Sequence, residues 1–227
     1  LCQSSQSYEL IKQYEKSIFV NHEKKIIGLI SSDILSKTSN ISSNTTKFLT
    51  FIRSKYEFIC TFHGSHISSK GAFHILEIAK NLNNVAFILP FDKKLFLDEY
   101  CRIHQEKINL NHLKNILFKE LNTKTGLIDL LENSDAQLIF SSWSSPIEIA
   151  LIKSLQLKSP LITFYTDSLN TTSEIHYQFI KKTGKGLQIK YPLNNDDYFD
   201  ASKKILSYLE KARNDIYQNK KFNLRDI

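Results

Sequence analysis

The fold is decided by residues 56–91, which read YEFICTFHGSHISSKGAFHILEIAKNLNNVAFILPF. The run 56–62 is β-branched and aromatic and ends just before Gly64, which is typical of a strand. From 69 to 82 apolar residues recur at helical spacing, which predicts an amphipathic helix. The continuous apolar run 85–91 is typical of a strand that is buried on both faces. These segments together predict a strand–helix–strand unit with parallel strands.

The same alternation continues along the rest of the chain. It predicts helices over 92–107, 123–133, 146–157, 171–182 and 196–218, and strands over 115–118, 136–140, 161–165 and 186–190. Asp92 is placed to cap the first of these helices. Such alternation indicates an α/β fold, namely a Rossmann-like parallel sheet with helices on both faces. Sheets of this kind bind ligands at the carboxyl ends of their strands.

The first part of the chain has a different pattern. Residues 2–16 read as a helix and 25–30 as a strand. Residues 36–46 are almost wholly Ser, Thr, Asn and Lys, which predicts a loop or linker. We therefore expect a boundary near 35–50, with residues 1–50 separate from a Rossmann-like domain over residues 51–227.

The composition is that of a globular protein, because 41% of the 227 residues are hydrophobic and 23% are charged. No run approaches the roughly 18 apolar residues that a membrane helix needs. The first residues lack the basic and apolar segments of a signal peptide, so we expect a cytoplasmic protein. Since the sequence contains no Met and starts at Leu1, we also expect a fragment, a processed chain or an altered sequence.

The net charge of +7 is spread along the chain in short lysine pairs, which favours a solvated surface. Such a surface could also contact the anionic inner face of a membrane. No segment resembles a known nucleic-acid-binding module, so we expect no nucleic acid partner. Cys2, Cys60 and Cys101 lie far apart, which argues against a disulfide framework or a zinc site. The seven histidines form no metal-binding pattern, and we expect no metal.

The first candidate site is the loop GSHISSKG at residues 64–71, between a predicted strand and a predicted helix. Gly64 lets the backbone approach a ligand. The helix that follows would present free N–H groups and its positive dipole end to a phosphate, and Lys70 adds a full charge. A helix cap with a solvated lysine is the alternative. The candidate ligand-binding residues here are Gly64, Ser65, His66 and Lys70. His63 immediately precedes this loop and could also contact a ligand.

The second candidate site is residues 141–148, which read SSWSSPIE. Ser145, Pro146 and Glu148 fit the N-cap, N1 and N3 positions of a helix, which form a capping box. A capped helix start after a strand is also where an anionic ligand is expected. Both interpretations remain open for Glu148, and Ser142 and Ser145 are candidates for ligand binding.

These residues, in this order, resemble the C-terminal, donor-binding domain of retaining GT-B glycosyltransferases of the glycogen-synthase-like superfamily. The resemblance runs from about residue 56 to the end of the chain. It rests on the strand–Gly–loop–Lys-Gly–helix unit of 62–82, on LIDLLENSDAQLIFSS at 127–142 and on LIKSLQLKSPLI at 151–162. Residues 1–50 would then be the end of the acceptor domain and the interdomain linker.

The resemblance implies a hexosyltransferase-type enzyme of polysaccharide biosynthesis. Such an enzyme moves a sugar from a nucleoside-diphosphate sugar to a glycan or a lipid-linked acceptor, and the family generally needs no metal or other cofactor. Lys70 matches one member of the family's diphosphate-binding pair, whereas Ser65 takes the place of its arginine. The family's two glutamates fall at Ser145 and Lys153, so we assign no catalytic residue. The alternative is a non-catalytic GT-B-like subunit that binds a partner protein or a glycan, which is a function that predicts these departures.

Overall fold

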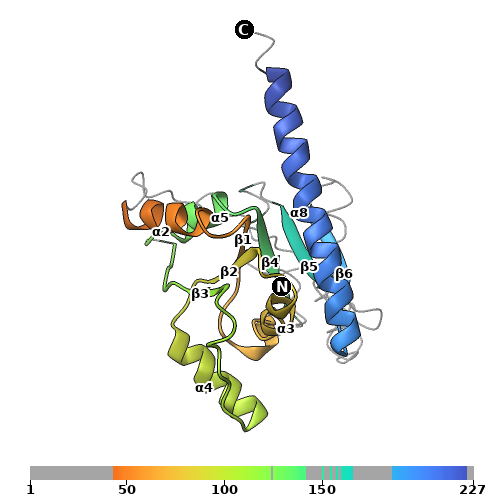
Figure 1. Ribbon diagram of the computed structural model, residues 1–227. Helices are drawn as coiled ribbons and strands as arrows, with labels where there is room; N and C mark the ends of the chain where they lie inside the picture. The colour runs from red at the N-terminus through yellow and green to blue at the C-terminus, as the bar shows by residue number, and fades with distance from the viewer. Residues whose placement is uncertain are drawn as a thin grey trace, which may run out of the picture.

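The computed structural model describes residues 43–123, 125–141, 150, 154, 157, 160–165 and 186–223. Six strands form one sheet in the order β3-β2-β1-β4-β5-β6 (Figure 1), and every neighbouring pair is parallel. The strands are β1 (Phe58–Phe62), β2 (Val85–Leu89), β3 (Ile116–Phe118), β4 (Ala136–Ile139), β5 (Leu161–Tyr165) and β6 (Gly186–Lys190). All six coincide with predicted strands, which confirms the parallel α/β sheet.

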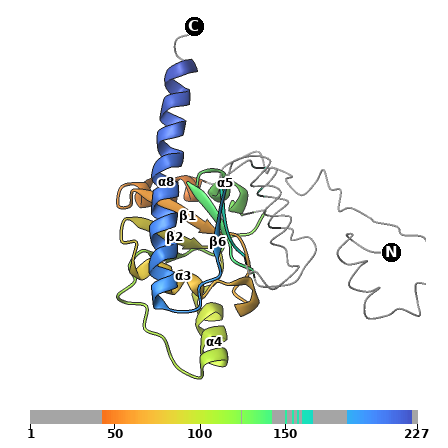
Figure 2. The same ribbon diagram turned by 90° about the vertical axis from the view of Figure 1, so that its right-hand side faces the viewer.

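Helices cover both faces of this sheet. They are α2 (Ser43–Arg53), the 3-10 turn η3 (Ser68–Lys70), α3 (His74–Lys80), α4 (Lys93–His104), α5 (Leu127–Glu132) and α8 (Asn195–Asn223). One apolar cluster joins the sheet to α3, α4 and α8, and a second joins it to α2 and α5. Figure 2 shows α8 crossing the sheet and extending beyond it. The predicted arrangement of helices on both faces is therefore confirmed.

The core follows from the alternation of side chains along a strand. Phe58, Cys60 and Phe62 of β1 belong to the α3/α8 cluster, and Ile59 belongs to the α2/α5 cluster. All five β1 residues are buried. Cys60 is a core residue, as expected, and its burial raises the pKa of its thiol.

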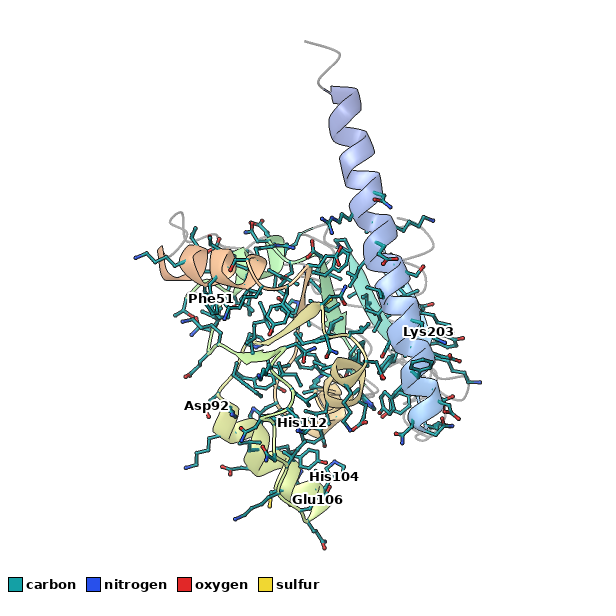
Figure 3. All side chains as sticks on the ribbon, in the orientation of Figure 1. Phe51, Asp92, His104, Glu106, His112 and Lys203 are labelled. Atoms are coloured by element: carbon teal, nitrogen blue, oxygen red, sulfur yellow. The ribbon has the colours of Figure 1, made fainter. Side chains whose placement is uncertain are left out.

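Local signals set the ends of α4. The Asp92 carboxylate accepts hydrogen bonds from the N–H groups of Lys94 and Leu95, so the predicted cap is confirmed (Figure 3). Gln105 takes the left-handed conformation, with φ 56°, and ends the helix before the predicted residue 107.

The loop predicted over 36–46 is wrong for residues 43–46, which form the first turn of α2. Tertiary packing overrides the polar composition here, because Thr45 is buried and Ile52 of the same helix is in the α2/α5 cluster. A Cβ on Gly126 would lie 2.6 Å from Thr45 Oγ1, so a glycine lets this helix approach the start of α5.

The single helix predicted over 69–82 is also wrong, since the chain forms η3, turns at Gly71 and then begins α3. Gly71 has φ 80°, a conformation that a continuous right-handed helix does not contain.

Several predicted elements lie outside the described residues, namely 2–16, 25–30, 171–182 and most of 146–157. Ala150, Ser154 and Leu157 of that last segment are described, and they are helical as expected. The division into domains at residue 50 stays a prediction.

His74 joins α3 to α8 through a half-buried aromatic cluster. Its Nδ1 lies 2.5 Å from the Tyr198 hydroxyl. Its ring stands edge-on to Phe164 and Tyr191, with centroids 5.3 and 4.8 Å away. Burial lowers the pKa of His74 to about 4, so the ring is neutral at pH 7.

The pKa of His74 generates a prediction about stability. Between pH 6.5 and about 4 the unfolded chain binds a proton at this residue that the folded chain does not. The contribution of neutral His74 to the free energy of unfolding is therefore complete above pH 6.5. It is lost as the pH falls toward 4, which lowers the free energy of unfolding by up to about 3 kcal/mol. We expect His74→Phe to flatten the fall in the free energy of unfolding over this interval, measured by urea denaturation at several pH values. His112→Gln, at an exposed position between α4 and β3 (Figure 3), is the control and should keep the wild-type slope. An unchanged slope in His74→Phe would contradict the assignment.

Candidate functional site

The strand order places the first candidate segment and the first residue of the second at one end of the sheet. The chain runs from β1 to β2 to β3 on one side and then returns to the other side of β1 as β4. The carboxyl ends of β1 and β4 therefore mark the point where the connections part in opposite directions. Doubly wound sheets bind their ligands at this switch point. His63 and Gly64 follow β1 here, and Phe140 and Ser141 follow β4.

The loop after β1 touches the chain after β4 directly. The hydroxyl of Ser141 donates to the carbonyl oxygen of Ser69 at 3.4 Å. The backbone N–H of His63 donates to the carbonyl of Leu138 at 2.9 Å, which extends the pairing of the two strands by one residue. The first predicted site therefore meets the first residue of the second.

Gly71 allows this close approach. A Cβ on Gly71 would lie 2.3 Å from the carbonyl oxygen of Phe140, and its φ of 80° is strained for other residues. Gly64, which the sequence analysis selected as a candidate, is less tightly packed than Gly71. A Cβ there would meet the ring of Phe62 at 2.8 Å and Lys70 Cβ at 3.5 Å, and neither atom belongs to the backbone. Lys70 thus lies beside Gly64, and Ser65 is exposed at the surface of the loop.

The break at Gly71 changes how this loop could meet an anion. The N–H groups of Lys70 and Gly71 donate to the carbonyls of Ile67 and Ser68 inside η3. The N–H groups of His74 and Ile75 are likewise bonded, to Gly71 and Ala72. The expected helix start with free N–H groups at residue 69 is therefore wrong, and the charge of Lys70 is the main feature that would attract a phosphate.

A carboxylate from α4 holds the loop from its other side. Glu99 Oε1 accepts the backbone N–H of Ser68 at 3.2 Å, and Arg102 binds Glu99 at 2.8 and 2.9 Å. The hydrogen bond from Arg102 is the main reason why the pKa of Glu99 is lowered to about 2. His66 packs with its ring 6.1 Å from that of Phe91. Sequence reasoning missed Glu99, because no local pattern relates it to Ser68.

His63 faces into the protein. It is 6% exposed, and its Nδ1 lies 3.1 Å from Gln137 Oε1 and 3.2 Å from Ser154 Oγ. Its partners lie on β4 and in the segment after it, so His63 connects the same two parts of the chain as Gly71.

The remaining predicted site residues, Ser142, Ser145 and Glu148, lie outside the described part of the chain, as does Lys153. Their roles stay predictions. Among the residues that the structure describes, no three His, Cys, Asp or Glu side chains are grouped so that they could hold a metal ion. None of the helices in this part is long and apolar enough to cross a membrane.

Solved structures of glycosyltransferases share this fold. A crystal structure of HepE from Anabaena in complex with UDP and glucose matches 86% of this chain and 52% of its own, with a TM-score of 0.53 and 15% sequence identity. The trehalose 6-phosphate synthase from Burkholderia multivorans matches 92% of this chain and 55% of its own, with a TM-score of 0.51 and 10% identity. No protein-family model and no curated protein matches the sequence.

The chain spans about half the length of these two solved structures. At such low identities the likeness establishes the fold. The fold is that of the GT-B glycosyltransferases, as the sequence resemblance predicted.

The close contact at Gly71 generates a second prediction. Gly71→Ala places a methyl group against the Phe140 carbonyl and forces a left-handed residue, so we expect a loss of about 2–4 kcal/mol in the free energy of unfolding. Ser65→Ala, at an exposed position of the same loop, is the control and should change stability by less than about 0.5 kcal/mol. Chemical denaturation of the three proteins measures both values. Equal stability of Gly71→Ala and the wild type would show that the two loops can separate without cost.

Proposed function

We propose that this chain is the nucleotide-sugar-binding half of a glycosyltransferase. It would bind a nucleoside-diphosphate sugar where β1 and β4 end and transfer the sugar to a glycan or a lipid-linked acceptor. One observation carries the proposal: the Gly64–Gly71 loop, with Lys70, meets Ser141 at the switch point of a sheet ordered β3-β2-β1-β4-β5-β6. The likeness to HepE, whose structure holds UDP and glucose, supports the same choice of ligand.

Lys70 carries the chemistry that this proposal requires. As the sugar leaves, negative charge develops on the departing diphosphate, and a fixed cation beside it lowers the barrier. Ser65 and His66 would line the approach to the diphosphate, and Ser142, Ser145 and Glu148 would contact the donor from the segment after β4. The proposal includes no metal or other cofactor, in line with the family that the sequence resembles. A cytoplasmic chain whose basic surface meets the inner face of a membrane would suit a lipid-linked acceptor.

A non-catalytic subunit with the same fold is the second candidate. Ser145 and Lys153 stand where the resembling family has its two glutamates, and Ser65 stands where it has an arginine. Such a subunit would use the ends of β1 and β4 to bind a partner protein or a glycan. It predicts no affinity for nucleotide sugars, which separates the two candidates.

The proposed function predicts that a nucleotide sugar stabilises the folded chain. A ligand that binds only the folded state raises the melting temperature, by an amount that corresponds to about 2.7 kcal/mol at a hundredfold excess over its Kd. We expect a rise with at least one of the UDP-, GDP- and dTDP-sugars in a thermal-shift panel, beginning with UDP-glucose. Free glucose is the control for the sugar alone. A panel without any shift favours the non-catalytic subunit.

Lys70 provides a test at the level of one residue. Lys70→Ala removes the charge that would face the diphosphate, so we expect the affinity for the stabilising nucleotide sugar to fall about 10- to 100-fold. Lys204→Ala removes an exposed lysine of α8 and is the matched control for net charge. Isothermal titration measures both. An equal loss in the two variants would point to a nonspecific charge effect and remove Lys70 from the site.

A further inference from the structure

Beyond the switch point, the α2/α5 face of the sheet carries buried polar side chains beside its apolar ones. On β1 and β2 this face carries Ile59, Ala86 and Ile88, which belong to the α2/α5 cluster. Alternation and register bring Thr61, His63, Gln137 and Thr163 onto the same face from β1 to β5. With Ser134 and Ser154 these side chains form a buried polar layer, since all six are at most 8% exposed. Nothing in the proposed chemistry uses this layer.

Gln137 lies at the centre of the polar layer. Its Oε1 lies 3.1 Å from His63 Nδ1 and 2.5 Å from Ser154 Oγ. The Ser154 hydroxyl shares its single proton between Gln137 Oε1 and the carbonyl oxygen of Ala150, which lies 2.9 Å away and one helical turn earlier. Gln137 therefore connects the residue before the Gly64 loop with the helical segment that contains Ala150 and Ser154.

One end of the Gln137 amide has no partner. In the part of the chain that the structure describes, its Nε2 is the one buried side-chain nitrogen or oxygen without a hydrogen bond. Turning the amide by 180° would leave its oxygen unpaired instead, because His63 Nδ1 and Ser154 Oγ lie on the same side of the amide. A buried, unpaired polar atom destabilises a fold, and a leucine of similar size would avoid it. Stability therefore does not account for a glutamine at this position.

We propose that Gln137 is a positioning residue of the donor site, which fixes the loop after β1 relative to the helical segment after β4. The reference to a donor rests on the proposed function. His63 is held twice, by its ring to Gln137 and by its backbone N–H to Leu138, so the first residue of the loop cannot shift along β4. Ser154 holds the other segment to the same amide. The network sets the distance between the two segments that the donor must bridge.

The test is Gln137→Leu, read by two independent measurements. Because Gln137→Leu removes the hydrogen bonds to His63 and Ser154, we expect amide hydrogen exchange of residues 63–71 to become at least about threefold faster. We expect the melting temperature to stay the same or to rise. We expect the affinity for the stabilising nucleotide sugar to fall about tenfold, since the two segments lose their alignment. Thr61→Val, which removes a buried hydroxyl of the same layer that is hydrogen-bonded to Ser134, is the matched control and should change neither reading.

The outcomes separate this inference from the proposed function. Unchanged exchange over 63–71 in folded Gln137→Leu overturns the positioning role, whether or not a donor binds. Faster exchange across the whole sheet, together with a lower melting temperature, also overturns it, because Gln137 would then be a general stabilising residue. If exchange rises only in 63–71 but no nucleotide sugar binds the wild type, the positioning role stands and the proposed function fails. Gln137→Met, which also removes the amide but keeps an unbranched side chain of similar length, gives the same readings if Gln137→Leu does not fold.

Discussion

β1 is the strand on which the rest of the sheet depends. It pairs with β2 along one edge and with β4 along the other, so its backbone is hydrogen-bonded on both sides and all five of its side chains are buried. A central strand of a parallel sheet has to be apolar on both faces, because crossover helices cover both. The connections part at this strand, so the loop that follows it emerges at the switch point.

The two faces of the sheet differ in the polarity of their buried side chains. The face toward α3 and α8 is apolar throughout, including the stacked rings of Phe140 and Phe164, and it supplies most of the core. The face toward α2 and α5 combines buried apolar side chains with the buried polar layer from β1 to β5. Buried polar networks specify one arrangement of their neighbours, even where an apolar core would be more stable. The polar part lies beside the loop that we assign to the donor.

Contacts from three directions hold that loop. The carboxylate of Glu99 on α4 accepts a hydrogen bond from the N–H of Ser68. The carbonyl of Phe140 packs so closely against Gly71 that no side chain fits there. Gln137 of β4 is hydrogen-bonded to the ring of His63. Several N–H groups of the loop are hydrogen-bonded within the loop itself. The loop therefore offers a phosphate the charge of Lys70 rather than a set of free backbone N–H groups. Under the proposed function, a charge held in place in this way would need no rearrangement as a diphosphate leaves.

The sequence alone was enough to predict the class of fold, which the structure confirms, and it also generated the hypothesis of a ligand site after β1 and β4. A strand that is buried on both faces carries a continuous apolar run, so the strand at 85–91 could be recognised from its sequence alone. The cap at Asp92 and the Gly64–Lys70 loop were also predictable, because the residues that indicate a helix cap or a loop are neighbours in the sequence. Tertiary structure decided the rest. Thr45 is helical because it packs beside Gly126, and the helix predicted from residue 69 breaks because Gly71 meets a carbonyl distant in sequence. Glu99 and Gln137 act through space on residues with which they share no periodic pattern, so only the folded chain reveals their partners.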